Sequence, residues 1–140
     1  MADLSRFLAA QAPVYDQALA ELRRGRKQSH WMWFVFPQLA GLGRSPTASF
    51  YAIESLAEAR AYLAHDLLGP RLVECTRAVL GHRGLAAEAI FGAIDAIKLR
   101  SSMTLFEAAV DDPTLFAATL DAFFHGERDP ATLNLLRTGG

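Results

Sequence analysis

Apolar residues recur every three to four positions through nearly the whole chain, which is the spacing of amphipathic helices rather than of strands. Residues 31–36 have a strand-like composition, but an isolated strand leaves buried backbone groups unpaired. We therefore read them as a short helix that Ser29 caps and that ends near Pro37. No repeat or interdomain linker interrupts the pattern. The sequence predicts an all-α fold, with residues 1–140 forming one compact domain of about seven or eight helices.

Several positions carry the signals that begin helices. Ser45 precedes a proline, and Ser55 stands three residues before Glu58 in a capping-box pattern. Asp112 and Asp129 each stand directly before a proline, so that a capping acid is followed by the residue favoured at the first helical position. We expect a helix to start at each of these places.

Composition narrows the classes of partner. The 14 basic and 15 acidic residues nearly cancel, so no bulk field draws the chain to nucleic acid or to an anionic membrane. The longest apolar run is residues 31–36, far short of the ~20 residues of a membrane span, and residues 1–20 lack the apolar core of a signal peptide. With Cys75 as its one cysteine, the chain is expected to be cytoplasmic, without a nucleic-acid or membrane partner.

The first candidate site lies between residues 23 and 33, where four cations and a histidine run directly into two tryptophans. Lys27 and His30 supply attraction and hydrogen bonds for a phosphate or carboxylate, and the indoles of Trp31 and Trp33 supply faces for stacking. The alternative is that the aromatic residues belong to the core and the basic residues lie on a solvated turn.

The second candidate is a polar stripe on the helix expected near residues 93–110. At 100° per residue, Asp95, Lys98 and Ser102 fall within about 60° of one another, and apolar residues border them on both sides. Three roles fit this stripe. Asp95 and Lys98 form an internal ion pair, or Lys98 and Ser102 bind an anion while Asp95 orients Lys98. In the third, Asp95 or His30 acts as a general base and Lys98 stabilises the developing charge. The ordinary solvated face is expected elsewhere, at Arg100, Thr104 and Glu107.

The third candidate is the glycine-bearing loop at residues 41–47. Its amides are able to form a concavity for an anion, with Arg44 as a charged arm and Ser45 as the cap of the following helix. The loop lacks the GK[ST] element of a P-loop and the third glycine of a dinucleotide fingerprint. As a plain turn between helices it needs no function.

Metal and nucleophile chemistry find little support in the sequence. The four histidines lie far apart and no paired Cys and His spacing occurs, so we expect no metal site and no cofactor. Cys75 is expected to be a buried apolar residue, and no Gly-x-Ser-x-Gly elbow is present.

The run from Gly25 to Leu39, GRKQSHWMWFVFPQL, resembles the hallmark of the domain of unknown function 1810 family, small bacterial proteins. The resemblance continues through residues 41–45, 51–53 and 68–72, and through a last block at residues 90–106 that contains Asp95, Lys98 and Ser102. It implies a compact, all-helical single domain and no activity that can be carried over. Members are sometimes labelled calpastatin, but that inhibitor is a long disordered chain, whereas this composition is that of a compact domain.

Three hypotheses follow. The first is a basic-aromatic cleft that binds a small anionic ligand bearing a phosphate or carboxylate, nucleotide-like ligands among them. The second is a structural or protein-interaction module, in which exposed aromatics of residues 31–36 contact a partner protein or a second copy. The third is an enzyme that uses His30 and Asp95. The ligand-binding residues expected under the first are Lys27, His30, Trp31, Trp33, Arg44, Ser45, Asp95, Lys98 and Ser102.

Overall fold

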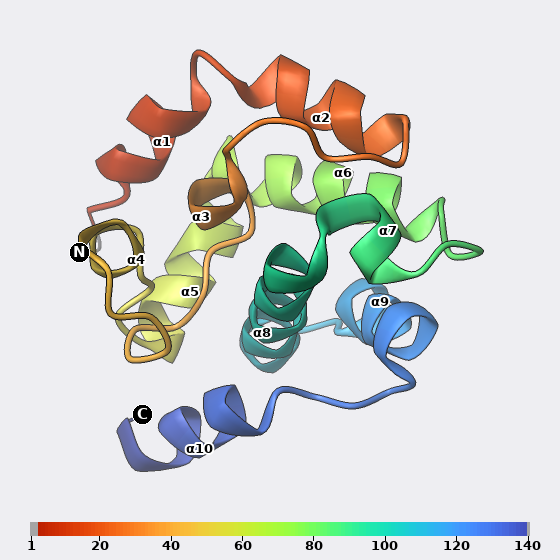
Figure 1. The fold of residues 1–140 in the computed structure, drawn as a ribbon. Helices are drawn as coiled ribbons and strands as arrows, with labels where there is room; N and C mark the ends of the chain where they lie inside the picture. Colours follow the sequence, from red (N-terminus) through yellow and green to blue (C-terminus); the bar gives the residue numbers. More distant parts are fainter. Residues whose placement is uncertain (1–2, 140) are drawn as a thin grey trace.

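The structure is a computed structural model that describes residues 3–139, and within them it contains ten helices and no strand. Leu39 and Ile53 form one isolated parallel bridge. Figure 1 shows α8 near the middle of the molecule, with the other helices around it. The helices are α1 (Ser5–Gln11), α2 (Tyr15–Arg23), α3 (Met32–Val35), α4 (Pro46–Phe50), α5 (Leu56–Ala64), α6 (Leu68–Leu80), α7 (Ala87–Phe91), α8 (Ala93–Ala109), α9 (Thr114–Phe124) and α10 (Pro130–Gly139).

The all-α prediction is confirmed, although the described chain has ten helices rather than seven or eight. One helix that the pattern did not indicate is α7, whose five residues are too few to show a helical period. Gly92 separates α7 from α8 because it adopts a φ of +82°, a conformation that ends the first helix.

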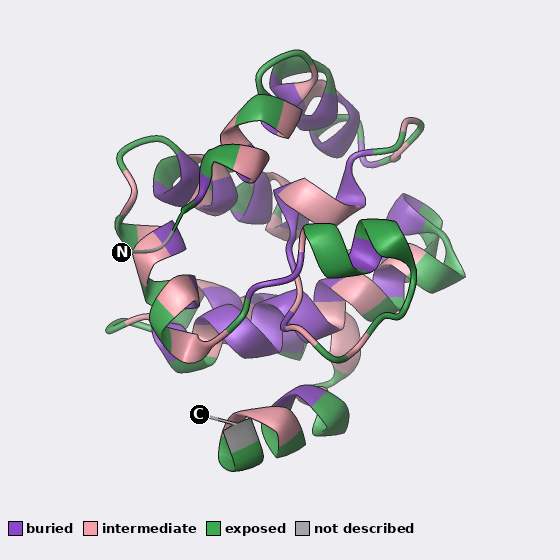
Figure 2. Cartoon of the chain, turned by 90° about the vertical axis from the view of Figure 1, so that its left-hand side faces the viewer, coloured by how far each residue is buried: buried purple, intermediate pink, exposed green. Residues whose placement is uncertain are grey.

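Helix α8 organises the core. It packs against α5, α7, α9 and α10, and Leu99, Met103 and Phe106 on it are completely buried. Figure 2 shows that buried residues gather on the inward sides of the helices. Tyr62 of α5 lies 5.5 Å from Phe106, ring centroid to ring centroid, and meets Phe7 of α1 edge-on at 5.1 Å. This chain of aromatic contacts joins the first helix to the central one.

The predicted helix starts are largely confirmed. Ser45, Ser55 and Asp129 each accept a hydrogen bond from the backbone N–H three residues ahead, at 3.1, 3.1 and 3.2 Å. Asp112 accepts from the N–H of Thr114 at 3.1 Å. Side-chain oxygens therefore satisfy amides that the first turn of a helix leaves without a partner.

The predicted cap at Ser29 is wrong. Helix α3 begins at Met32 with Trp31 at its N-cap position and no side-chain cap. The Ser29 hydroxyl donates instead to the carboxylate of Glu21, at 2.6 Å. The carboxylate, a charged acceptor on α2, holds the hydroxyl two residues before the N-cap position of α3.

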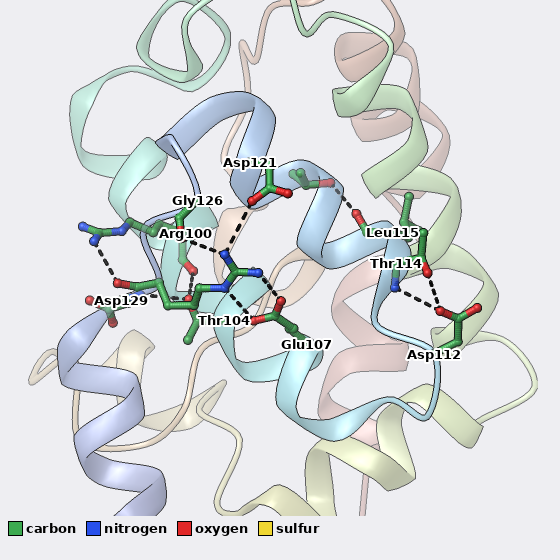
Figure 3. A network of polar contacts seen from close by, with 11 residues as sticks. Arg100, Thr104, Glu107, Asp112, Thr114, Leu115, Asp121, Gly126 and Asp129 are labelled. Atoms are coloured by element: carbon green, nitrogen blue, oxygen red, sulfur yellow. Dashed lines mark hydrogen bonds and ion pairs between the residues drawn. The ribbon is translucent and has the colours of Figure 1, made fainter.

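The face of α8 predicted to be solvated is covered instead. Arg100 donates to the Arg128 carbonyl at 2.8 Å, the Asp129 N–H donates to the Thr104 hydroxyl at 2.9 Å, and Glu107 accepts from Nε of Arg128 at 2.9 Å (Figure 3). Thr104 is consequently buried. The spacing along α8 did not reveal this, because the partners lie more than twenty residues further along the chain.

Along residues 3–139, no helix combines the length and the apolar character that a membrane span needs.

Gly69 lies at the closest approach of α5 and α6, where a Cβ atom would stand 2.0 Å from the backbone oxygen of Leu63. We predict that Gly69→Ala lowers the free energy of unfolding by at least about 2 kcal/mol, because backbone must shift to admit the methyl group. Gly84→Ala is the matched control, since a Cβ there meets no described atom within 4 Å. Urea denaturation measures both, and equal effects of the two substitutions would contradict this packing.

Candidate functional site

The basic turn between α2 and α3 is fixed at the junction of α7 and α8. Gly25 adopts a φ of +77°, which turns the chain at the end of α2. The N–H of Lys27 then donates to the carbonyl of Ile90 at 2.7 Å. This backbone bond brings residue 27 beside the first turn of α8, where Asp95 lies.

Glu21 on α2 fixes the turn through hydrogen bonds to its carboxylate. Its carboxylate accepts hydrogen bonds from the N–H groups of Gln28 and Ser29, from the Ser29 hydroxyl and from the indole of Trp31, at distances between 2.6 and 3.0 Å. Burial opposes ionisation of this group, but these donors outweigh it and lower the pKa of Glu21 to about 2. Glu21 is not among the residues that the sequence predicted for the site, because an acid beside Leu22 in an amphipathic helix gives no local sign of its distant hydrogen-bond partners.

Asp95 lies between two lysines that come from different parts of the chain. One carboxylate oxygen is 3.0 Å from Nζ of Lys27, and the other accepts from Nζ of Lys98 at 3.2 Å. The side chains of Lys27, Asp95 and Lys98 are only 9%, 18% and 17% exposed. We call these three residues the Lys–Asp–Lys cluster.

Both tryptophans of the basic segment lie against this cluster. Nζ of Lys98 stands 3.7 Å above the ring centre of Trp33, and Nζ of Lys27 stands 5.2 Å from that of Trp31. Trp31 is 1% exposed and belongs to the core, whereas Trp33 is half-buried. The aromatic faces therefore stabilise the two cations, at about 0.5–2 kcal/mol each.

Ser102 continues the stripe one helical turn beyond Lys98. It is completely buried, and its hydroxyl finds no hydrogen-bond partner within the described residues 3–139. The predicted stripe therefore does turn inward, with its charged end at the protein surface and its hydroxyl end in the core.

The glycine loop lies on another side of Trp33. Gly41, Gly43 and Trp33 contribute to the lining of a cavity of about 150 Å³, and Glu54 is the charged residue in that lining. Ser45 caps α4 as predicted, and Arg44 is exposed and does not line the cavity. The loop and the Lys–Asp–Lys cluster thus share Trp33, but the cavity carries a carboxylate rather than a cation.

His30 is not gathered with the other candidates. Its side chain is exposed and makes no hydrogen bond or ion pair within residues 3–139, while the Asp95 carboxylate is occupied by the two lysines.

Burial raises the pKa of the Cys75 thiol to about 12, which keeps it neutral. Within residues 3–139, no group of three or more His, Cys, Asp or Glu side chains is placed to hold a metal ion.

The cluster has a defined charge. Two ammonium groups face one carboxylate, so it carries a net charge of +1 while largely withdrawn from water. Each ammonium has three N–H donors, and Asp95 engages one from each. The arrangement can therefore offer further N–H donors and one unbalanced positive charge to an incoming anion.

A family model and a solved structure both match this chain along nearly its whole length. A family model described as a protein of unknown function, DUF1810, matches residues 1–136. The chain belongs to the DUF1810 family. The DUF1810 fold is also seen in the crystal structure of the conserved hypothetical protein Rv1873 from Mycobacterium tuberculosis, which is 57% identical, with a TM-score of 0.95 over 97% of each chain. No curated protein matches the chain. The DUF1810 assignment carries no activity, so function is argued from the site.

Glu21 makes stability dependent on acid pH. Its pKa is near 4.5 in the unfolded chain and about 2 in the folded protein, so its contribution is present above pH 4.5 and is lost as the pH falls toward 2. We predict that Glu21→Gln lowers the free energy of unfolding at pH 7 by about 2–3 kcal/mol and flattens its decline between these pH values. Urea denaturation across pH tests this, with exposed Glu127→Gln as the control. An unchanged acid limb in Glu21→Gln would contradict the assignment.

Ser102 and Ser101 form a natural pair for measuring the unpartnered hydroxyl. Ser101, also buried, has its hydroxyl within hydrogen-bond distance of two acceptors, the Ile97 carbonyl at 3.2 Å and the Asp129 carboxylate at 3.0 Å, so its one O–H has a partner. We predict that Ser102→Ala leaves the free energy of unfolding unchanged or raises it by up to about 1 kcal/mol, whereas Ser101→Ala lowers it by about 1 kcal/mol. Chemical denaturation measures both, and a loss at Ser102→Ala as large as that at Ser101→Ala would show that the hydroxyl is satisfied.

Proposed function

We propose that the protein binds a small anionic ligand, bearing a phosphate or a carboxylate, at the Lys–Asp–Lys cluster. The observation that carries the proposal is that two lysines with little solvent exposure, Lys27 and Lys98, share the single carboxylate of Asp95. An anion placed beside them balances the remaining charge and accepts hydrogen bonds from N–H groups that Asp95 does not use.

A purely structural role explains only part of this arrangement. One lysine paired with Asp95 would tie the turn at residue 27 to α8 and leave the pair neutral. The second lysine adds a positive charge that is partly withdrawn from water and that Asp95 does not balance. Stacking on Trp33 stabilises this ammonium by about 2 kcal/mol, and a nearby anion would stabilise it further. The excess charge is what a bound anion accounts for.

The two alternative hypotheses have less support. The interaction hypothesis depended on an exposed aromatic patch at residues 31–36, but Trp31 and Phe36 are at most 1% exposed, and Trp33 and Phe34 are half-buried. The enzyme hypothesis depended on His30 meeting Asp95, and no contact between them is present in the described part of the chain. The ligand site is therefore the function that the geometry favours.

Asp95→Asn separates ligand binding from a structural ion pair. The substitution keeps the shape of the side chain but raises the net charge of the cluster from +1 to +2. We predict that it tightens binding of inorganic phosphate and of acetate about tenfold, although it lowers stability, because it removes the anion that competes with the ligand. Lys98→Met should weaken binding at least tenfold, and the methionine keeps an apolar contact with Trp33. Isothermal titration calorimetry at constant ionic strength measures each affinity.

The charge-matched control is Glu127→Gln, which removes one negative charge from a carboxylate that is 74% exposed. It should leave both affinities unchanged. Lys98→Arg keeps the positive charge and should retain binding. Binding that is kept in Lys98→Arg and lost in Lys98→Met assigns the loss to the missing charge at this position. If Asp95→Asn lowers stability and binds neither anion better than Glu127→Gln does, the cluster is an internal ion pair and the proposal is wrong.

A further inference from the structure

The first two turns of α8 have an inverted pattern of burial. Ile94 and Ile97 are 72% and 66% exposed, while the side chains of their neighbours Asp95 and Lys98 are less than one fifth exposed. They are the two most exposed large apolar residues among those the structure describes. Single exposed apolar residues are common on protein surfaces, but two isoleucines side by side next to a charged cluster form a candidate contact surface for an apolar group.

The exposed isoleucines adjoin the Lys–Asp–Lys cluster. Ile94 and Lys98 are four residues apart on α8, so their Cβ atoms lie about 5–6 Å apart, and Ile97 is the neighbour of Ile94 one turn on. Ile94 and Ile97 therefore form an exposed apolar strip along the first two turns of α8, and this strip borders Lys98.

We infer that the ligand is an amphipathic monoanion, a carboxylate or a phosphate diester joined to a short alkyl chain. The anionic group lies at Lys27 and Lys98, and the alkyl chain lies along Ile94 and Ile97. This inference rests on the proposed function and adds the class of ligand to it. A single negative charge matches the cluster, because Asp95 already neutralises one of the two lysines.

The size of the strip favours a small molecule over a second copy of the chain. A stable dimer buries about 800 Å² on each partner, which two isoleucines and the small residues beside them do not supply. An alkyl chain of four to eight carbons needs only a strip of this length, since the two isoleucines are one helical turn, about 5 Å, apart.

Carboxylates of increasing chain length test the inference: acetate, butyrate, hexanoate and octanoate, titrated into the whole protein by isothermal titration calorimetry. A fully buried methylene strengthens binding about fourfold, so on this half-open strip we expect about twofold per methylene and at least about 30-fold from acetate to octanoate. The variant Ile94→Ser/Ile97→Ser should bind acetate as the wild type does and lose the dependence on chain length. Leu85→Ser, at a leucine that is 45% exposed, is the control and should keep it.

The outcomes separate this inference from the proposal on which it rests. If acetate and phosphate bind but octanoate binds no more tightly, the site is an anion site and the apolar strip has no part in it. If the dependence on chain length persists in Lys27→Met/Lys98→Met, the alkyl chain binds elsewhere and the inference is wrong. If no carboxylate and no phosphate binds, the proposed function itself fails. Sedimentation velocity completes the test, because dimers that dissociate in Ile94→Ser/Ile97→Ser would make the strip an interface between copies.

Discussion

The carboxylate of Asp95 makes an ion pair that ties the turn after α2 to the central helix. It reaches Lys27 in the turn after α2 and Lys98 on its own helix, so one side chain fixes the position of two cations. Because Asp95 lies in the first turn of α8, it also opposes the positive end of the helix dipole. Removing it would disturb the helix start, the turn and the charge of the site together.

A second carboxylate prepares the turn for this contact. Glu21 accepts hydrogen bonds from two backbone amides, a hydroxyl and an indole, and thereby fixes the conformation of residues 28–31 next to Lys27. The two acids act at different places on the same segment. Glu21 shapes the turn from inside the protein, and Asp95 holds its cationic end at the surface.

Local chemistry accounts for what the sequence predicted well. Capping residues such as Ser45, Ser55 and Asp129 act on amides three residues away, so their effect is readable from a short window. The inward turn of Asp95, Lys98 and Ser102 followed from helical geometry alone, since one helix carries all three. What failed were pairings between distant segments: Ser29 with Glu21, and Thr104 with Asp129. No periodicity encodes those, because each depends on which helices the fold brings together.

The position of Trp33 gives the molecule an internal optical probe. The chain has two tryptophans, and they sit in contrasting surroundings: Trp31 is sealed in the core with its indole bound to Glu21, whereas Trp33 is half-buried with an ammonium 3.7 Å above its ring. A charge so close to an indole face shifts the energy of its excited state. The fluorescence of Trp33 therefore registers any event that moves or neutralises Lys98, without a label being attached to the protein.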